Sequence, residues 1–502
     1  MMRRRAASLR RIPGIVWLSL GGLSLRFLLA YGLFRGSGFK GDVATFVGWA
    51  EGLARHGPGG FYANVVADYL PGYLYVLWLI GSIGESLSRL LGGGTVSFGG
   101  NTYSLAFFFD AALLKLPPIA ADALIGCLIY IVVRRWMAGR PGSERAALGA
   151  AALYVFNPVT WYDSALWGQL DAVGTLAMLG AIVLLVEGWG EGAVAATVVA
   201  AMIKPNYGVV LVPIVAVVLL RRHLFAVGSG PKVTLGMRFL PAALRLEQGP
   251  WRLVSSAAVG IGLLYVLVAP FGLDAASLSR KLNDAAGIFP YLSVNAYNPW
   301  ALVGTGGHLP LALSDVVGPS VPPAATGEWS SDVLPLVGPI AAVTLGSLLL
   351  AIGFAVGVAQ LAVRDSRRSI LLVAAFLSLA FFILPTRVHE RYAFPIFAIL
   401  PLLAVGSRSF TIVTAAAAAA VLVNIHAVLT LPPLSTTDLT GLPFGEASRS
   451  FPVILASVVA VTAAFGVLLW RLRPAVDLVI DPVRRRLGMA PRPPDPDPFE
   501  PA

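Results

Sequence analysis

Two isolated aspartates lie in a polar, glycine-rich stretch near the start of the sequence. Asp42 and Asp68 fall within residues 35–73, between the first two apolar spans. A carboxylate in such a place can act as a general base that takes a proton from an attacking hydroxyl. An aspartate at a loop-to-helix junction is also a common N-cap. The sequence leaves both roles open for each acid.

A second group of candidate residues is the segment TRVHERY, residues 386–392. Arg387 and Arg391 are four residues apart and share a face if the segment is helical. The forked donors of arginine suit a phosphate group. His389 could donate to a phosphate oxygen, and Glu390 could orient a neighbouring cation. The alternative is a salt-bridge cluster that anchors a helix end at a membrane interface.

Two lysines lie at junctions between apolar segments. Lys115 precedes a double proline, and Lys204 precedes Pro205-Asn206. Each could contribute a positive charge to an anion site. Each could also extend its ammonium group to the membrane surface, as lysines near the ends of spans often do.

The remaining candidates are amide and acid side chains that could support such a site or bind an acceptor. They are Gln169 and Asp171 in WGQLD and Asn295 in NAYNPW. Gln169 and Asp171 could instead satisfy backbone groups at a helix break. Trp161 and Trp167 in the same region could belong to an aromatic belt at the membrane surface.

The composition determines the elements that must position these residues. Of 502 residues, 57% are hydrophobic and only 13% are charged, and the mean hydropathy is +0.78. Soluble domains carry about 25% charged residues. Repeated apolar runs of membrane-spanning length occur along the chain. We therefore expect an all-α polytopic membrane protein.

About fourteen apolar spans are expected, and several are too short to cross a membrane alone. Some of the short spans meet in pairs at proline, at residues 116–118, 157–158 and 204–206. Broken backbone is tolerated at membrane depth where protein or a water-filled cavity satisfies it. The expected spans are residues 13–34, 70–84, 103–115, 118–134, 146–157, 162–186, 191–203, 206–222, 252–271, 334–362, 370–385, 392–406, 410–430 and 451–470.

The basic residues predict the orientation of these spans. With the N-terminus inside, the inner segments, which include 85–102, hold 26 of the 37 lysines and arginines, as the positive-inside rule requires. Residues 1–12 then form a basic cytoplasmic N-terminus, and residues 471–502 form a disordered cytoplasmic tail. The transmembrane domain is residues 13–470, with external loops at 35–69 and 273–333. All candidate residues named above fall on the outer side.

The same patterns exclude several kinds of site. The net charge of +11 is spread over short loops between apolar runs, so no nucleic-acid partner is expected. The histidines show no metal-ligand spacing, and no Asp-x-Asp pair occurs in the outer loops, so we expect no metal or other cofactor. No glycine-rich nucleotide-binding loop is present. The single cysteine, Cys127, forms no intramolecular disulfide.

In order and spacing, these motifs resemble the GT-C superfamily of polytopic glycosyltransferases that use polyprenyl-phosphate sugars. They are most similar to the dolichyl-phosphate-glucose glucosyltransferases of N-glycan precursor assembly and to bacterial mannosyltransferase-like relatives. The resemblance covers residues 13–470. The matching stretches are GDVATFVGW, ADYLPGYLY, KLPPIAAD, NPVTWYDSALWGQLD, IKPN and RVHERYAFP. Two departures are Leu70-Pro71 for the usual double proline and Arg391 for a lysine.

The resemblance implies an inverting transfer of a hexose on the non-cytoplasmic face, in the plasma membrane. Asp42 would be the general base, and the acceptor would be a lipid-linked or cell-envelope glycan. His389, Arg391, Arg387, Lys115 and Lys204 would stabilise the phosphate of the leaving group. Asp68 would bind the acceptor or hold the loop. The alternative is a transporter or flippase of lipid-linked sugars, which needs the cations but no base. A structural membrane protein would not explain polar groups gathered on one side.

Overall fold

A computed structural model describes residues 13–98, 101–225, 249–303, 331–333, 335–432 and 434–472. The expected basic N-terminus 1–12, most of the tail 471–502 and much of the outer loop 273–333 lie outside these residues. The described secondary structure is helical apart from two short antiparallel strand pairs, β1 (Thr95–Phe98) with β2 (Asn101–Ser104) and β3 (Pro335–Val337) with β4 (Ile340–Ala341).

The helices differ widely in length. Apolar sequence favours long helices, and the glycines and prolines at their ends terminate them. The helices are α1 (Gly14–Phe27), α2 (Lys40–Asn64), α3 (Pro71–Leu90), α4 (Leu105–Leu113), α5 (Leu116–Trp136), α6 (Ser143–Val155), α7 (Pro158–Trp161), α8 (Asp171–Val186), α9 (Gly190–Ile203), α10 (Pro205–Leu219), α11 (Trp251–Val268), α12 (Ala275–Gly287), α14 (Ala342–Val363), α15 (Arg367–Ile383), α16 (Ile396–Ala404), α17 (Arg408–Leu429), α18 (Thr437–Thr440), α19 (Gly445–Ser448) and α20 (Phe451–Arg471).

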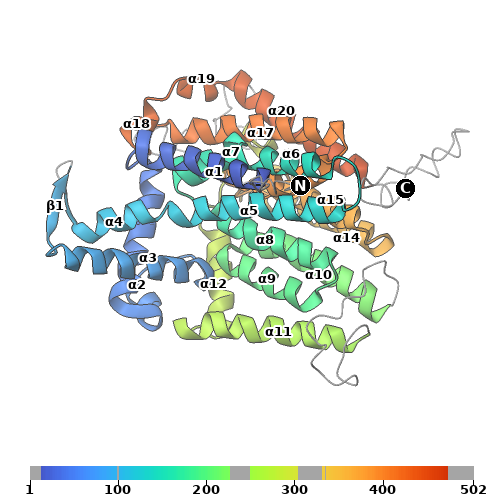
Figure 1. The fold of residues 1–502 in the computed structure, drawn as a ribbon, viewed down its shortest axis with the longest axis horizontal. Coiled ribbons are helices and arrows are strands. Elements are labelled where there is room, and N and C mark those ends of the chain that lie inside the picture. Colours follow the sequence, from blue (N-terminus) through green and yellow to red (C-terminus); the bar gives the residue numbers. More distant parts are fainter. Residues whose placement is uncertain are drawn as a thin grey trace, which may run out of the picture.

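Most long helices run side by side and form one bundle (Figure 1). Seven helical stretches within the described residues are long and apolar enough to cross a membrane. Shorter apolar helices, α8 and α9, lie parallel to them. The expected class, an all-α polytopic membrane protein, is confirmed. The seven long stretches are residues 14–33, 105–136, 205–224, 251–271, 342–363, 408–429 and 451–471.

One end of the bundle, which we call the basic end, is rich in arginine ion pairs. There Arg135 pairs with Glu187 at 2.6 Å, and Arg222 Nε lies 2.6 Å from Asp365 Oδ2. Arg252 pairs with Glu191 at 3.1 Å. These pairs tie the ends of neighbouring helices together where the charged side chains leave the apolar layer.

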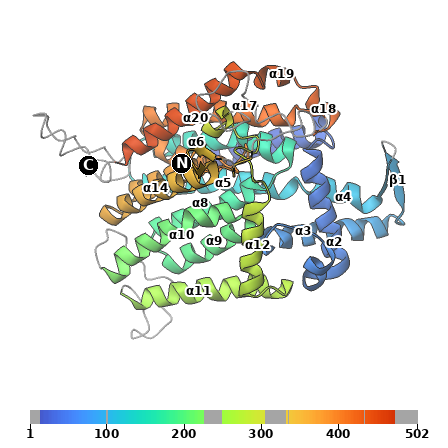
Figure 2. The same ribbon diagram turned by 180° about the vertical axis from the view of Figure 1, so that it is seen from behind.

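Two helices lie across the opposite end of the bundle. Figures 1 and 2 show α2 and α12 running roughly at right angles to the bundle helices. The helix expected after Asp42 is present as α2, and its place at a membrane interface stays a prediction. Both helices are amphipathic, which suits a surface between apolar and polar surroundings.

The expected topology of residues 70–134 is wrong. The spans 103–115 and 118–134 join into one nearly straight rod, Leu105–Trp136, and α3 pairs with its first part, α4 (Figure 1). The segment 85–102, expected at the inner side, therefore lies at the same end as α2. Its single basic residue, Arg89, pairs with Glu85 at 2.6 Å. The positive-inside rule, which depends on the number of basic residues, therefore gave little information about the side on which this segment lies.

Two of the three expected breaks at proline are confirmed, at residues 157–158 and 204–206, whereas at residues 116–118 the two helices continue as one rod. α5 begins at Leu116, just before the double proline, and α7 begins at Pro158 with the side chain of Asn157 as its N-cap. α10 begins at Pro205, directly after α9 ends. Proline is favoured in the first turn because its missing N–H has no intrahelical partner there.

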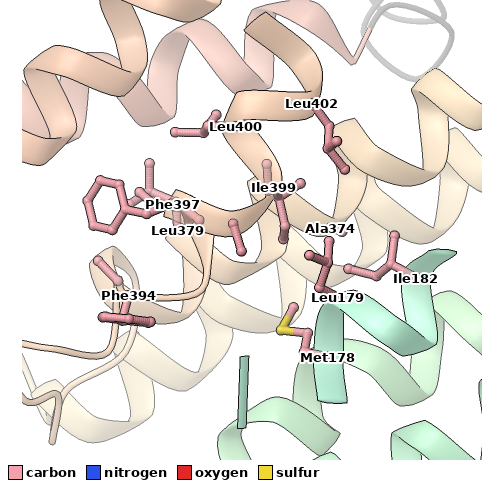
Figure 3. Close-up of a cluster of buried hydrophobic side chains, with 14 of the residues drawn as sticks. Met178, Leu179, Ile182, Ala374, Leu379, Phe394, Phe397, Ile399, Leu400 and Leu402 are labelled. Atoms are coloured by element: carbon pink, nitrogen blue, oxygen red, sulfur yellow. The ribbon is translucent and has the colours of Figure 1, made fainter. Parts of the chain in front are cut away.

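The apolar core lies between α8, α15 and α16, as Figure 3 shows. Met178 and Ile182 of α8 face Ala374 and Leu379 of α15, and Ile399 of α16 completes the contact. These side chains are at most 1% exposed. The packing fixes the start of α8 and the loop before α16, which carry residues of the candidate site.

Candidate active site

The carboxylate of Asp42 is held by hydrogen bonds from a distant part of the chain. The indole Nε1–H of Trp167 donates to Asp42 Oδ2 at 2.7 Å, and the Gln169 amide Nε2–H donates to the same oxygen. Asp42 lies in the first turn of α2, where the helix dipole favours a negative charge. The N-cap of α2 is Phe39, and no side chain caps the helix, so the capping alternative for Asp42 is wrong.

Trp167 and Gln169 are placed by an irregular turn before α8. Residues Tyr162–Trp167 form a π-helical turn, which ends at Gly168 in the left-handed conformation with φ 82°. Glycine adopts this conformation without a Cβ penalty. The backbone N–H groups of Gly168 and Gln169 both donate to the Asp163 carbonyl, at 3.0 and 3.1 Å. Trp167 is 1% exposed, so its assignment to an aromatic belt is wrong.

Arg391 lies between three carboxylates. Its guanidinium approaches Asp42 Oδ2 at 4.0 Å and Asp171 Oδ2 at 3.5 Å, and it donates to Glu390 Oε1. The guanidinium carbon lies 5.2 Å from the centre of the Trp167 ring. The expectation that Glu390 orients a neighbouring cation agrees with this contact.

Asp171 and Lys204 form a buried ion pair next to Arg391. Lys204 Nζ donates to Asp171 Oδ1 at 2.7 Å, and the hydroxyl of Tyr207 donates to the Asp171 carbonyl at 2.9 Å. The Lys204 side chain is 8% exposed, and the Asp171 side chain is 1% exposed. Lys204 therefore does not extend to a membrane surface. The pair joins the first residue of α8 to the residue before α10.

Lys115 is a buried cation of a different kind. Its residue is 4% exposed, so it does not extend to a membrane surface either. Its ammonium donates to the Ser37 hydroxyl at 2.7 Å, and it forms no ion pair with any described residue. A charged group buried without a counter-ion is costly, and an anion beside it would offset that cost.

The segment 384–395 is a series of turns between α15 and α16, so the expected shared helical face of Arg387 and Arg391 is wrong. Arg387 has φ 65° and turns away from Arg391. Its guanidinium pairs with the buried Asp332 at 2.7 Å and donates to the Ala286 carbonyl at 2.9 Å. Arg387 thus ties this segment to the end of α12.

His389 lies beside Arg391 and is half-buried. Its ring meets Phe289 edge-on at 5.0 Å and lies 5.2 Å from Tyr392. The pKa of His389 lies well below its usual value, because burial opposes the charged form and Arg391 and Lys204 add positive charge nearby. A neutral imidazole still carries one N–H that can donate to an anion.

The other two predicted residues line the same region. Asp68 is exposed in the loop between α2 and α3. The N-cap of α3 is Leu70, with no side-chain hydrogen bond, so capping by Asp68 is also wrong. Asn295 has φ 65° and forms backbone bridges with His389, while its carbonyl accepts from Asn424 at 2.7 Å.

Three helix N-termini converge on this region. α5, α8 and α10 begin at Leu116, Asp171 and Pro205, next to Lys115, Gln169 and Lys204. Helix N-termini carry partial positive charge, which favours anions. Prolines in the first turns of α5 and α10 lack an N–H, so fewer free N–H donors are present there. The structure therefore brings Asp42, Gln169, Asp171, Lys204, Glu390 and Arg391 together, with Lys115, His389 and Asp68 at the margins and Arg387 directed elsewhere.

Comparisons with known proteins give a similarity in structure. No family model and no curated protein sequence matches the chain. Among solved structures, the chain is similar to ArnT from Cupriavidus metallidurans bound to undecaprenyl phosphate. The sequences are 13% identical, the match covers 92% of this chain and 78% of that chain, and the TM-score is 0.42. At this level of similarity, the match assigns no activity to this chain.

Trp167 is the residue of the site whose role the sequence did not indicate. Its signal was its place two residues before Gln169 in WGQLD, a motif already selected for its polar groups. Asp163, in the same motif, is fully buried, and neither of its carboxylate oxygens has a hydrogen-bond partner in the described part of the chain. Burial of this kind does not follow from an aspartate's place in a sequence.

Proposed function

We propose that the protein is a GT-C-type inverting glycosyltransferase. It moves a hexose from a polyprenyl-phosphate donor to a hydroxyl of a lipid-linked or cell-envelope acceptor. The observation that carries the proposal is the Asp42 carboxylate, oriented by two N–H donors and lying 4.0 Å from the Arg391 guanidinium. A base and a phosphate-binding cation in one site suit an inverting displacement, in which the sugar lies between them. Because the two catalytic groups of inverting glycosidases are about 6.5–9.5 Å apart, donor binding would have to move Arg391 away from Asp42.

In the proposed reaction, the acceptor oxygen forms a bond to the anomeric carbon as the bond from that carbon to the phosphate oxygen breaks. Asp42 takes the proton of the acceptor hydroxyl late in this step, when the hydroxyl becomes acidic. Positioning then matters more than the strength of the base. The electron pair of the broken bond leaves with the polyprenyl phosphate.

The growing charge on the leaving phosphate would be stabilised by the cations around the site. Two of these cations, Arg391 and Lys204, both contact Asp171. His389 can donate one N–H as a neutral ring. Lys115 has no carboxylate partner among the described residues, so binding of an anion would supply its missing counter-ion. Removal of one such donor typically costs about 3–4 kcal/mol in the transition state. Asp68 lies at the exposed side of the site, where an acceptor would enter.

The proposal places this chemistry at the end of the bundle opposite the basic end, on the non-cytoplasmic face of the plasma membrane. The arginines at the basic end suit the cytoplasmic side of the membrane, because cytoplasmic segments are enriched in basic residues. The reaction needs no metal or other cofactor, because the charged groups are supplied by the chain. The proposed partners are the lipid-linked donor, the glycan acceptor and membrane lipids.

A transfer assay tests the proposal. Purified protein is incubated with a panel of polyprenyl-phosphate hexoses and pentoses and a membrane lipid extract, and products are identified by mass spectrometry. The parental protein is expected to transfer sugar from at least one donor, and Asp42→Asn should lower that rate about 10²- to 10⁴-fold. A lipid-linked sugar transporter would move the donor across the membrane of vesicles. In that case the Asp42→Asn variant would be as active as the parental protein.

A further inference from the structure

The two oxygens of the Asp42 carboxylate have different surroundings. Oδ2 accepts from both Trp167 and Gln169 and faces Arg391. A carboxylate oxygen accepts along about two lone-pair directions, so Oδ2 is saturated. Oδ1 accepts no hydrogen bond from the described residues, and the Asp42 side chain is 26% exposed. Oδ1 is therefore the oxygen that can receive a proton from a ligand.

The Trp167 ring is itself held firmly. Phe39 stacks on it with ring centres 5.3 Å apart and an interplanar angle of 23°. The Arg391 guanidinium lies over the ring at 5.2 Å. Phe39 immediately precedes α2, so the stack connects the start of the helix that carries Asp42 to the turn that carries Trp167. The indole N–H thus has a fixed direction before any substrate arrives.

From these contacts we infer that Trp167 and Gln169 are positioning residues for the Asp42 carboxylate. They hold Oδ2, so that Oδ1 points to the acceptor hydroxyl. Neither residue touches the reacting atoms in this arrangement. The inference rests on the proposed function, which it extends by naming the atom that takes the proton and the residues that direct it.

The charged and titratable groups that face Asp42 come from two other segments. Arg391 and Glu390 belong to the turns before α16, and Asp68 and Tyr69 belong to the loop before α3. These groups remain when an N–H donor to Asp42 is removed. Loss of a donor makes a carboxylate easier to protonate, so the acidic limb of the pH–rate profile should move to higher pH.

Three single variants test the inference. Trp167→Phe keeps an aromatic ring between Phe39 and Arg391 but removes the N–H, and Gln169→Met removes the second donor at similar size. Trp161→Phe is the matched control, because it is the same substitution in the same segment and the Trp161 ring packs at a tilt against Tyr162 instead of contacting Asp42. Rates are measured from pH 4.5 to 9 with the panel donor that the parental protein uses. Binding of undecaprenyl phosphate is measured in parallel.

Trp167→Phe and Gln169→Met are each expected to lower kcat about 10- to 100-fold, the loss that a misplaced reacting group produces. The acidic limb moves to higher pH in both variants, and undecaprenyl phosphate binds within about threefold of parental affinity. Trp161→Phe keeps the parental rate and profile. A purely structural role would lower the active fraction in Trp167→Phe without moving the pH profile.

Two further outcomes separate this inference from the proposed function. If the parental protein transfers sugar and both variants keep its kcat and its pH profile, the positioning role is refuted and the proposed function stands. If the parental protein transfers from no donor of the panel, the proposed function fails, and the inference is overturned with it.

Discussion

Arg391 Nη2 lies 4.0 Å from Asp42 Oδ2, so the proposed phosphate-binding cation and the proposed base attract each other in the free protein. Phosphate binding must compete with that attraction. Asp42→Asn removes the competing charge and keeps the shape. We expect undecaprenyl phosphate to bind the variant equally or more tightly, by up to about fivefold for an ion pair worth about 1 kcal/mol. Weaker binding in equilibrium titrations would show that Asp42 contributes to the phosphate site.

The cationic residues of TRVHERY should differ in how much they contribute to the binding of undecaprenyl phosphate. Arg391→Ala should weaken binding of undecaprenyl phosphate about tenfold or more, since hydrogen bonds to charged groups contribute about 1.5–3 kcal/mol. His389→Ala should weaken it less, because a neutral imidazole donates one N–H. Affinity for a neutral glycan acceptor should stay within about twofold. Equal losses for both ligands, with the fold intact, would indicate a structural cluster.

Arg387→Ala is the matched control for that comparison. It leaves the buried carboxylate of Asp332 without its guanidinium partner, which costs about 3 kcal/mol or more for a buried pair. We expect a lower thermal unfolding temperature and parental affinity for undecaprenyl phosphate in the folded fraction. A loss of affinity as large as that of Arg391→Ala would place Arg387 in the phosphate site after all.

Lys115 allows stability and binding to be separated. Lys115→Met removes a buried charge that has no ion-pair partner among the described residues. Replacing buried ionic groups by apolar ones of similar volume is often neutral or stabilising. We expect thermal stability at or above the parental value, together with about tenfold weaker binding of undecaprenyl phosphate. Unchanged affinity would remove Lys115 from the donor site.

Asp122, the acid at the end of KLPPIAAD, should affect stability alone. It accepts from Arg26 at 2.7 Å and from the Tyr154 hydroxyl at 2.6 Å, and it is 1% exposed. Asp122→Ala should therefore cost about 3–5 kcal/mol. The double variant Arg26→Met, Asp122→Leu should recover much of this loss in thermal unfolding. A transfer rate below the parental one in the stable double variant would contradict a structural role.

His389 gives the fold a pH dependence with a definite sign. Its pKa lies well below the value of about 6.5 in an unfolded chain. Below pH 6.5 the unfolded chain binds a proton at this histidine that the folded protein does not bind. The free energy of unfolding therefore falls by up to about 1.4 kcal/mol for each pH unit of acidification. His389→Gln should show a smaller loss than the parental protein between pH 7.5 and 5 in thermal unfolding. Equal losses would mean that His389 takes up its proton in the folded state.

The sequence predicted the class of the protein and the grouping of its site because both depend on composition and charge. Asp42, Asp171 and Lys204 stand out as lone ionisable groups in an apolar chain, and such groups are costly unless they serve a purpose. The positive-inside rule placed them at one end. Proline marked the start of α10, next to Lys204, whereas no proline marks the start of α8 at Asp171.

The remaining features depend on contacts between distant segments. Whether 103–115 and 118–134 cross twice or form one rod changes the place of only one basic residue, Arg89. The direction of the Arg387 side chain depends on Asp332, more than fifty residues away. The role of Trp167 depends on which oxygen its N–H reaches. Hydropathy and charge patterns along a chain contain none of this information.

The π-helical turn at Tyr162–Trp167 makes the length of this segment as important as its chemistry. A π-helical turn holds one more residue than an α-helical turn, and each residue of an α-helix turns the chain by about 100°. Deletion of a single residue there could restore a regular helix and still rotate the Trp167 indole away from Asp42. The active arrangement would then depend on a spacing that hydrophobicity and charge along the chain do not reveal.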